Sequence, residues 1–152
     1  MVDKRIGKDV DFPESAGAII ETIEFIPYMS AYQNLADIAA MRGNLSKTQI
    51  KEVLEMVGLG NVGRKHVSKF SMGMRQRLAI AQAVMESPKL LILDEPMNGM
   101  DEKGVEEMRR LILARKAAGT TIILSSHNIE DIRILCDQVY RIDAGVVMRE
   151  VE

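Results

Sequence analysis

The sequence predicts an α/β fold in which a parallel sheet carries an inserted α-helical subdomain. Short apolar segments alternate with segments of helical periodicity, a pattern typical of strands joined by helical crossovers. Two of these segments, Lys89–Leu93 and Thr120–Ser125, are apolar on both faces, as strands covered by helices on both sides should be. Between Glu21 and Leu90 only helical patterns occur, so this stretch is expected to interrupt the sheet.

Length and composition indicate one globular domain. The chain has 152 residues, 47% of them hydrophobic and 28% charged, enough to bury a core. Its formal charge of −2 gives no electrostatic reason to expect nucleic acid as a partner. The single cysteine, Cys136, excludes an intrachain disulfide framework and a multi-cysteine metal site. No apolar run suits a membrane span and no signal peptide is evident, so we expect a cytosolic chain.

Apolar segments and helix-capping residues mark the elements in chain order. The predicted strands are Ala16–Glu21, Lys89–Leu93, Thr120–Ser125 and Gln138–Ile142. Ser30 with Gln33, and Ser46 with Gln49, have the spacing of capping boxes, in which each member of the pair bonds the other's backbone amide. The helices expected in the inserted block lie at about residues 31–42, 47–57 and 72–86.

Two further helices are predicted after the block. Asp101 is placed to cap a helix that runs to about Ala118, where Gly119 ends it. The apolar stripe of this helix consists of Val105, Met108 and Ile112. Asn128 is placed to cap a last helix through Cys136.

One glycine motif is rejected as a nucleotide site. Gly58, Gly60 and Gly63 match the dinucleotide-binding pattern G-x-G-x-x-G. That pattern needs a strand before it and a helix opening on it, so that backbone amides face the pyrophosphate. Here a predicted helix precedes the glycines and no apolar strand pattern surrounds them. We interpret the segment as a glycine-stopped helix followed by a loop.

An acidic pair follows the apolar strand near residue 90. Asp94 and Glu95 would stand at the carboxyl edge of the sheet, where α/β proteins bind ligands. One carboxylate can hold Mg²⁺ through water, and its neighbour can deprotonate an attacking water. Taken alone, the pair fits a helix-start signal equally well, and Pro96 agrees with either interpretation.

Two other segments carry candidate site residues. Ser71 is a good N-cap, and its hydroxyl with the amides around Gly73 can form an anion site at a helix N-terminus. His127 follows an apolar strand, where a catalytic histidine can stand. By themselves, a plain capped helix and a local capping or core histidine remain open alternatives for these segments.

The order of these segments resembles the ATP-binding subunit of ABC transporters, in the bacitracin- or lantibiotic-type exporter branch. FSMGMRQRL (70–78) is similar to the family's signature segment, and LLILDEP (90–96) to its Walker B motif with the catalytic glutamate. NGMD (98–101) resembles the D-loop, and SSH (125–127) the segment of the switch histidine. The resemblance extends from about Ala16 to the C-terminus.

The resemblance implies a division of the chain into three parts. Residues 1–21 would be a remnant of the N-terminal core with the glutamine-loop strand, and residues 22–87 the helical subdomain with the signature segment. Residues 88–152 would be the C-terminal part of the ATPase core. The fold would then be an incomplete P-loop NTPase sheet of the ABC type.

The resemblance also implies roles for individual residues. Asp94 would help to hold Mg²⁺ through water, Glu95 would be the general base, and His127 would contact the γ-phosphate of ATP. In this family two ATPase domains enclose two ATP molecules head to tail. Ser71 and Gly73 would therefore meet the ATP of the opposite subunit, and Asp101 would couple the two sites.

The chain departs from the family pattern in its signature and its glutamine loop. Met72 and Met74 replace the first glycine and the glutamine of the usual LSGGQ segment, whereas Ser71 and Gly73 remain. Glu21 stands in the place of the glutamine-loop residue. A carboxylate there can still bind Mg²⁺ or water, but it adds negative charge near the phosphates.

A third departure is the absence of the Walker A phosphate loop, G-x-x-x-x-G-K-[ST]. The only Gly-Lys pair, Gly7 with Lys8, is followed by Asp9 and lacks the preceding glycine. The chain resembles the back two-thirds of an ABC ATPase, without the lysine, hydroxyl and amides that bind the phosphates. In the family the strand before this loop separates the third and fourth predicted strands. Those strands should then have open edges or pair with each other, and we expect poor stability or self-association.

Two functions from different classes follow. The first is an ATP-hydrolysing component of an exporter, present as a piece that does not hydrolyse ATP alone. It would work with a transmembrane permease and a second ATPase subunit at the inner face of the cell membrane. The second is a non-catalytic subunit that donates its signature segment in trans to an intact ATPase, and a decayed gene product is a third reading.

Overall fold

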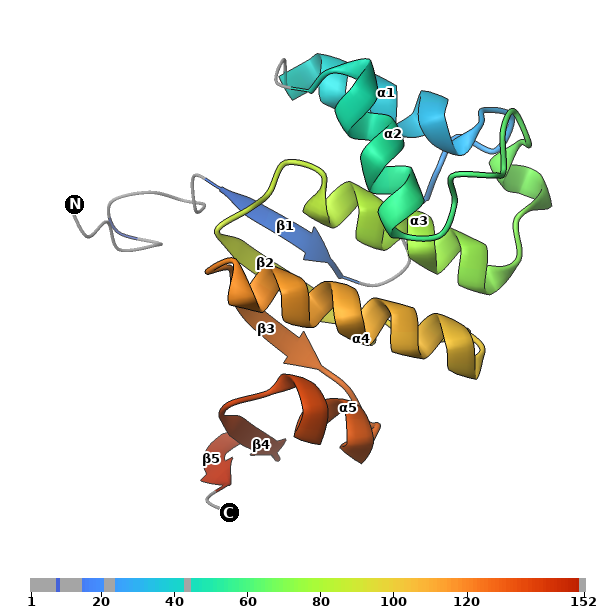
Figure 1. Cartoon of the computed structure of the whole chain (residues 1–152). Helices are drawn as coiled ribbons and strands as arrows, with labels where there is room; N and C mark the ends of the chain where they lie inside the picture. Colours follow the sequence, from blue (N-terminus) through green and yellow to red (C-terminus); the bar gives the residue numbers. More distant parts are fainter. Residues whose placement is uncertain (1–7, 9–14, 21–23, 43–44, 151–152) are drawn as a thin grey trace.

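The computed structural model describes residues 8, 15–20, 24–42 and 45–150, and the order of its elements follows the predicted alternation (Figure 1). The parallel sheet has the order β1-β2-β3. Its strands are β1 (Ala16–Ile19), β2 (Leu90–Asp94) and β3 (Thr121–Ser125). The register places Ala16 beside Leu90 and Asp94 beside Ser125. The predicted α/β class with a parallel sheet is therefore confirmed.

The described residues between β1 and β2 fold into the expected helical block. Its elements are α1 (Ala31–Arg42), α2 (Lys47–Met56), the 3₁₀ turn η1 (Val67–Lys69) and α3 (Met72–Val84). Both predicted capping boxes form, with Oγ of Ser30 accepting from the Gln33 amide and Oγ of Ser46 accepting from the Gln49 amide, each at 3.2 Å. In each box the glutamine Oε1 accepts from the serine amide at 2.9 Å.

Helix α3 packs directly against β1 and joins the block to the sheet. A Cβ atom on Gly17 would lie 1.9 Å from the carbonyl oxygen of Ala83, so only glycine allows this approach. Leu78 and Ile80 of α3 and Leu91 of β2 are at most 1% exposed. Much of the core thus lies between the helical block and the first two strands.

Helix α4 (Glu102–Ala117) connects β2 to β3, and α5 (Ile129–Leu135) follows β3. Asp101 and Asn128 cap these helices as predicted. Met108 and Ile112 of the predicted stripe are buried, and Val105 is half-buried. Within the described part of the chain, every helix is too short or too polar to cross a membrane.

Strand β3 differs from the prediction. It was expected to be covered on both faces, but Thr121, Ile123 and Ser125 are exposed, and Ile122 and Leu124 are only half-buried. The reason is that no described element buries the face that carries Thr121, Ile123 and Ser125, and the opposite face is only partly covered. Of the two arrangements expected for this region, open edges and mutual pairing, the described strands show open edges.

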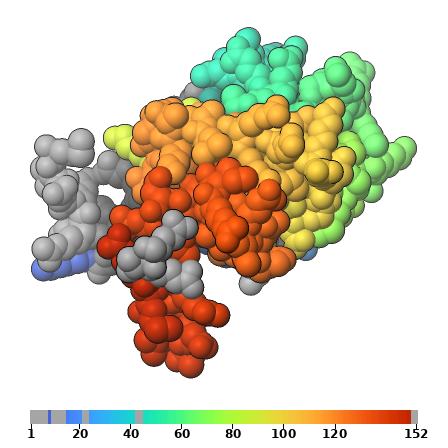
Figure 2. Space-filling view, turned by 60° about the horizontal axis from the view of Figure 1, so that its bottom comes forward, coloured from blue at the N-terminus to red at the C-terminus, as the bar shows by residue number. Residues whose placement is uncertain are grey.

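The last predicted strand does not join the parallel sheet. β4 (Val139–Asp143) pairs antiparallel with β5 (Val146–Glu150), a strand that the sequence analysis missed. Ala144 and Gly145 make the turn with φ of 47° and 81°, the left-handed conformation of tight hairpins. Figure 2 shows this hairpin, in red, projecting from the rest of the surface.

Candidate functional site

The carboxyl end of β2 carries the predicted acidic pair. Asp94 is the last residue of the strand, and its Oδ1 accepts a hydrogen bond from the hydroxyl of Ser125 at the end of β3. The amide of Glu95 donates to the carbonyl oxygen of Ser125 at 3.0 Å. Both carboxylates are thus fixed at the edge of the sheet where the parallel strands end.

Glu95 and His127 form a pair across this edge. Oε1 of Glu95 accepts from the backbone amide of His127 at 2.9 Å and lies 2.8 Å from Nδ1 of the same residue. Because a carboxylate only accepts, the ring contact requires a proton on Nδ1, which leaves Nε2 turned to other partners. The imidazole is 82% exposed and the Glu95 side chain 34% exposed, so the pair is open to a ligand.

Glu95 has an unusual backbone conformation. Its φ is 46°, which is uncommon for a residue with a Cβ and costs on the order of 1–3 kcal/mol. The chain turns sharply here, just ahead of Pro96, and the turn takes the carboxylate to the loop after β3. Such strain persists where the surrounding contacts fix it, and the Ser125 and His127 contacts do so here.

The segment 70–78 lies beside the loop that follows β2. Oγ of Ser71 accepts from the amide of Met74 at 3.2 Å and caps α3. A Cβ atom on Gly73 would lie 3.1 Å from the carbonyl oxygen of Gly99, so the helix start and the 98–101 loop are closely packed. Nε2 of Gln76 donates to the carbonyl oxygen of Glu95 at 3.5 Å, a contact that the sequence analysis missed.

The remaining predicted site residues are placed differently. Asp101 acts locally, since its Oδ1 accepts from the amide of Gly104 at 2.9 Å and caps α4. Glu21 lies outside the described residues. The structure therefore brings Asp94, Glu95 and His127 together, and sets Gly73 against the adjacent loop, with Ser71 as the cap of the same helix.

The donor set at β2 fits a magnesium ion. Mg²⁺ takes hard oxygen ligands and is usually held by one or two carboxylates together with water and substrate phosphates. Asp94 and Glu95 supply such oxygens, whereas no group of three or more acidic, histidine or cysteine side chains in the described part of the chain could hold a metal ion by itself. The residues at this edge thus suit an ion shared with a phosphate ligand.

The G-x-G-x-x-G segment, which we rejected as a dinucleotide site, forms a loop as predicted. Gly58 and Gly63 have φ of 76° and 57° in the turns that follow α2. A Cβ atom on Gly58 would lie 2.5 Å from Nη1 of Arg77, whose guanidinium donates to the carbonyl oxygen of Val57 at 2.7 Å. Gly58 therefore leaves room for Arg77, which caps the C-terminal end of α2 by its hydrogen bond to Val57.

Comparison with known proteins agrees with this architecture. The family model described as ABC transporter matches residues 4–98. The chain is 43% identical over 142 residues to the ATP-binding protein YybJ of Bacillus subtilis, covering 93% of this chain and 65% of YybJ. It is 43% identical over 136 residues to the lantibiotic transport ATP-binding protein SrtF of Streptococcus pyogenes, covering 90% of this chain and 59% of SrtF.

A third relative and the solved structures complete the comparison. The bacitracin transport ATP-binding protein BcrA of Bacillus licheniformis is 46% identical over 136 residues, which are 89% of this chain and 44% of BcrA. The chain thus spans less than two thirds of the length of these curated relatives. A bacterial ABC transporter cassette solved as a dimer has a TM-score of 0.77 at 23% identity, covering 89% of this chain and 62% of the cassette. The chain therefore belongs to the ABC transporter family.

Proposed function

We propose that this chain provides the hydrolytic carboxylate and the signature segment of an ATP-driven exporter. The observation that carries the proposal is the Glu95–His127 pair at the end of β2, with contacts of 2.8 and 2.9 Å. It supports Glu95 as the general base and His127 as the contact to the γ-phosphate. The proposal keeps the three expected parts, residues 1–21, 22–87 and 88–152.

The contacts of Glu95 and His127 favour particular atoms for these proposed roles. Both His127 contacts fall on Oε1 of Glu95, so Oε2 is the oxygen that would accept the proton of the attacking water. Nε2 of His127 would face the γ-phosphate, and it donates a hydrogen bond there only as the imidazolium, because Nδ1 already donates to Glu95. When bound, Mg²⁺ held through water by Asp94 would offset the phosphate charge.

The other site residues are assigned to a partner's nucleotide. Ser71 and Gly73 stand at the N-terminus of α3, where amides and a hydroxyl favour an anion. Gly73 is also packed against the 98–101 loop, so a displacement of this loop, which includes Asp101, would displace the signature segment as well. We propose ATP of a second ABC subunit as the ligand, with Glu21 near the phosphates in the chain's own half.

The names of relatives support the transport role. SrtF and BcrA are lantibiotic and bacitracin transport ATP-binding proteins. One solved cassette of the same fold is a post-hydrolysis state bound to ADP and Pi, at a TM-score of 0.76. We propose a transmembrane permease and a second ATPase subunit as partners, with the chain at the inner face of the membrane.

A second function is favoured by the sequence itself. The 152 residues contain no G-x-x-x-x-G-K-[ST] segment, the motif that cradles ATP phosphates, whereas the signature residues Ser71 and Gly73 are present. In this alternative the chain donates Ser71 and Gly73 in trans to an intact ATPase, and Glu95 has no catalytic part. In either case we expect the purified chain to release no phosphate from ATP, and sustained Glu95-dependent release would contradict this expectation.

A mixing experiment separates the two functions. The chain is added to an ABC ATPase that has its own phosphate loop, and phosphate release is followed. If the chain is a catalytic component, Ser71→Arg and Glu95→Gln both abolish the increase. If it acts only in trans, Ser71→Arg abolishes the increase and Glu95→Gln does not. Ser46→Arg is the matched control, because it removes a serine N-cap of the same block outside the signature segment.

No increase in phosphate release for any version of the chain would contradict both functions. An increase that survives Ser71→Arg as well as Ser46→Arg would show that the signature segment has no part in it. An increase lost equally in both serine variants would point to loss of the helical block instead, and circular dichroism of the variants checks that outcome.

A further inference from the structure

A buried ion pair joins α4 to α5 away from the reacting groups. Nε and Nη2 of Arg109 donate to Oδ1 of Asp131 at 2.8 and 2.6 Å. The Asp131 side chain is 4% exposed and that of Arg109 is 13% exposed. Nη2 also donates to Oε2 of Glu130 at 3.0 Å. A carboxylate this deeply buried needs its partners, so the pair fixes where α5 begins relative to α4.

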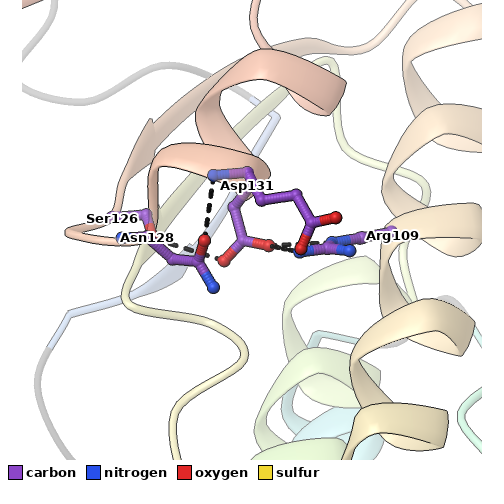
Figure 3. Close-up of polar contacts among 5 residues, drawn as sticks. Arg109, Ser126, Asn128 and Asp131 are labelled. Atoms are coloured by element: carbon purple, nitrogen blue, oxygen red, sulfur yellow. Dashed lines mark hydrogen bonds and ion pairs between the residues drawn. The ribbon is translucent and has the colours of Figure 1, made fainter.

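The second oxygen of the same carboxylate reaches the loop that contains His127. Oδ2 of Asp131 accepts from the hydroxyl of Ser126 at 3.3 Å, and Oγ of Ser126 accepts from the amide of Asn128 at 3.1 Å. Oδ1 of Asn128 in turn accepts from the amide of Glu130 at 2.9 Å. Figure 3 shows these contacts leading from Arg109 through Asp131 to Ser126 and Asn128. Both neighbours of His127 are therefore held by one network.

His127 itself has little packing to fix it. Its side chain is 82% exposed, and its contacts to Glu95 are made by the backbone amide and by Nδ1. The amide contact depends directly on the backbone position of the loop. An exposed loop is mobile unless hydrogen bonds or packing hold it, so the orientation of His127 depends on the bonds made by its neighbours.

We propose that Arg109 is a positioning residue, which acts through Asp131 and Ser126 to hold His127 against Glu95. On the other side of the loop, Ser125 donates to Asp94, so the loop is attached to both the sheet edge and α5. The inference rests on the proposed function for its meaning in ATP hydrolysis. Its geometric content, the coupling of Arg109 to the Glu95–His127 contact, can be measured without ATP.

The test measures the chemical shifts of the His127 imidazole by nuclear magnetic resonance in the 152-residue chain. The sequence has two histidines, and His66 lies before η1 in the helical block, so it serves as an internal reference. Glu95→Gln is expected to shift the His127 ring signals, because it replaces the carboxylate that accepts from Nδ1. This Glu95-dependent shift is then measured again in each variant background.

In the Arg109→Met and Ser126→Ala backgrounds we expect the Glu95-dependent shift of His127 to be lost, with the His66 signals unchanged. Ser126→Ala leaves the Arg109–Asp131 pair intact, so it keeps the test decisive if Arg109→Met does not fold. Arg110→Met is the matched control: the Arg110 side chain is 77% exposed and pairs with Glu106, and we expect the full shift.

A full Glu95-dependent shift in a folded Arg109→Met chain, or in Ser126→Ala, would overturn the inference and leave Arg109 as a connection between two helices. Loss of the shift in Arg110→Met as well would also overturn it, because the effect would then not be specific to Arg109. These outcomes involve no nucleotide. A failed mixing experiment together with a lost shift in both Arg109→Met and Ser126→Ala would thus reject the proposed function while retaining the positioning role.

Discussion

The residues up to Ile112 and those after Thr120 are packed in different ways. In the described part of the chain, Leu135 is the only buried hydrophobic residue beyond Ile112. In the second region Ile123, Ile142 and Val147 are 56%, 73% and 62% exposed. The first region is therefore stabilised by apolar burial. The second depends more on strand hydrogen bonds, helix caps and ion pairs.

The Glu95–His127 pair spans these two regions. Glu95 follows β2, in which Leu91 and Leu93 are 1% exposed, so the core fixes the end of this strand. His127 follows β3, which is mostly exposed or half-buried, and its loop is held by polar contacts. Packing therefore fixes the strand that precedes the base, whereas hydrogen bonds fix the loop that carries the histidine.

The largest expected effect comes from truncating one apolar side chain in each region. Leu78→Ala should lower the free energy of unfolding by about 2–5 kcal/mol, because it leaves a cavity at a side chain that is 0% exposed. Ile142→Ala, on the exposed hairpin, should change it by no more than about 0.5 kcal/mol. Urea denaturation of both variants measures the difference, and equal losses would show that the two regions do not differ.

A smaller effect is expected in the reactivity of the single thiol, Cys136, at the end of α5. Burial raises the pKa of this thiol, so little of the reactive thiolate is present while the second region stays folded. The folded chain holds this proton more tightly than the unfolded chain. The contribution of this thiol to stability should therefore be lost as the pH rises above the ordinary value of 9.0, so labelling is done below that pH.

We expect alkylation of Cys136 to proceed through local opening of the second region. Its rate should then be nearly the same in the unsubstituted chain and in Leu78→Ala, because that substitution weakens the other region. Mass spectrometry of the alkylated chain gives the rate. Acceleration of labelling in proportion to the stability lost in Leu78→Ala would mean that Cys136 is exposed only by global unfolding.

The smallest expected effect concerns association. Exposed apolar strands invite pairing with other chains, and a charge on such a strand opposes it. Val147→Lys on β5 should therefore weaken self-association of the purified chain by a few fold. Met41→Lys is the control, since Met41 is 79% exposed in the helical block. Sedimentation velocity over a range of concentrations measures both, and a fully monomeric chain without substitutions would contradict the expected association.

Local signals in the sequence were sufficient to predict where most of the helices and strands begin and end. Ser46, Ser71 and Asp101 were predicted as N-caps, and each accepts the expected backbone amide. The strand predicted at Lys89–Leu93 is displaced by one residue, to Leu90–Asp94. These features are decided within a few residues of chain, by capping bonds, proline and hydrophobic period, so no distant partner is needed to predict them.

The hairpin and the exposure of β3 could not be predicted in this way. The segment 138–142 has the composition of a strand, but composition does not say which strand it pairs with. Pairing with β5 depends on the turn at Ala144 and Gly145, whose short span the sequence analysis did not interpret. The burial of an apolar strand likewise depends on which elements lie over it.

The sequence by itself determined the class of fold, the helix starts, and which residues are candidates for chemistry, because these depend on residue type and short spacing. Tertiary structure alone decided that Glu95 meets His127, that Gly73 packs on the loop containing Gly99, and that Arg109 reaches Asp131. Their separations along the chain are too long for any local rule. They meet because parallel strands carry their carboxyl ends to one edge and because α4 and α5 pack beside it.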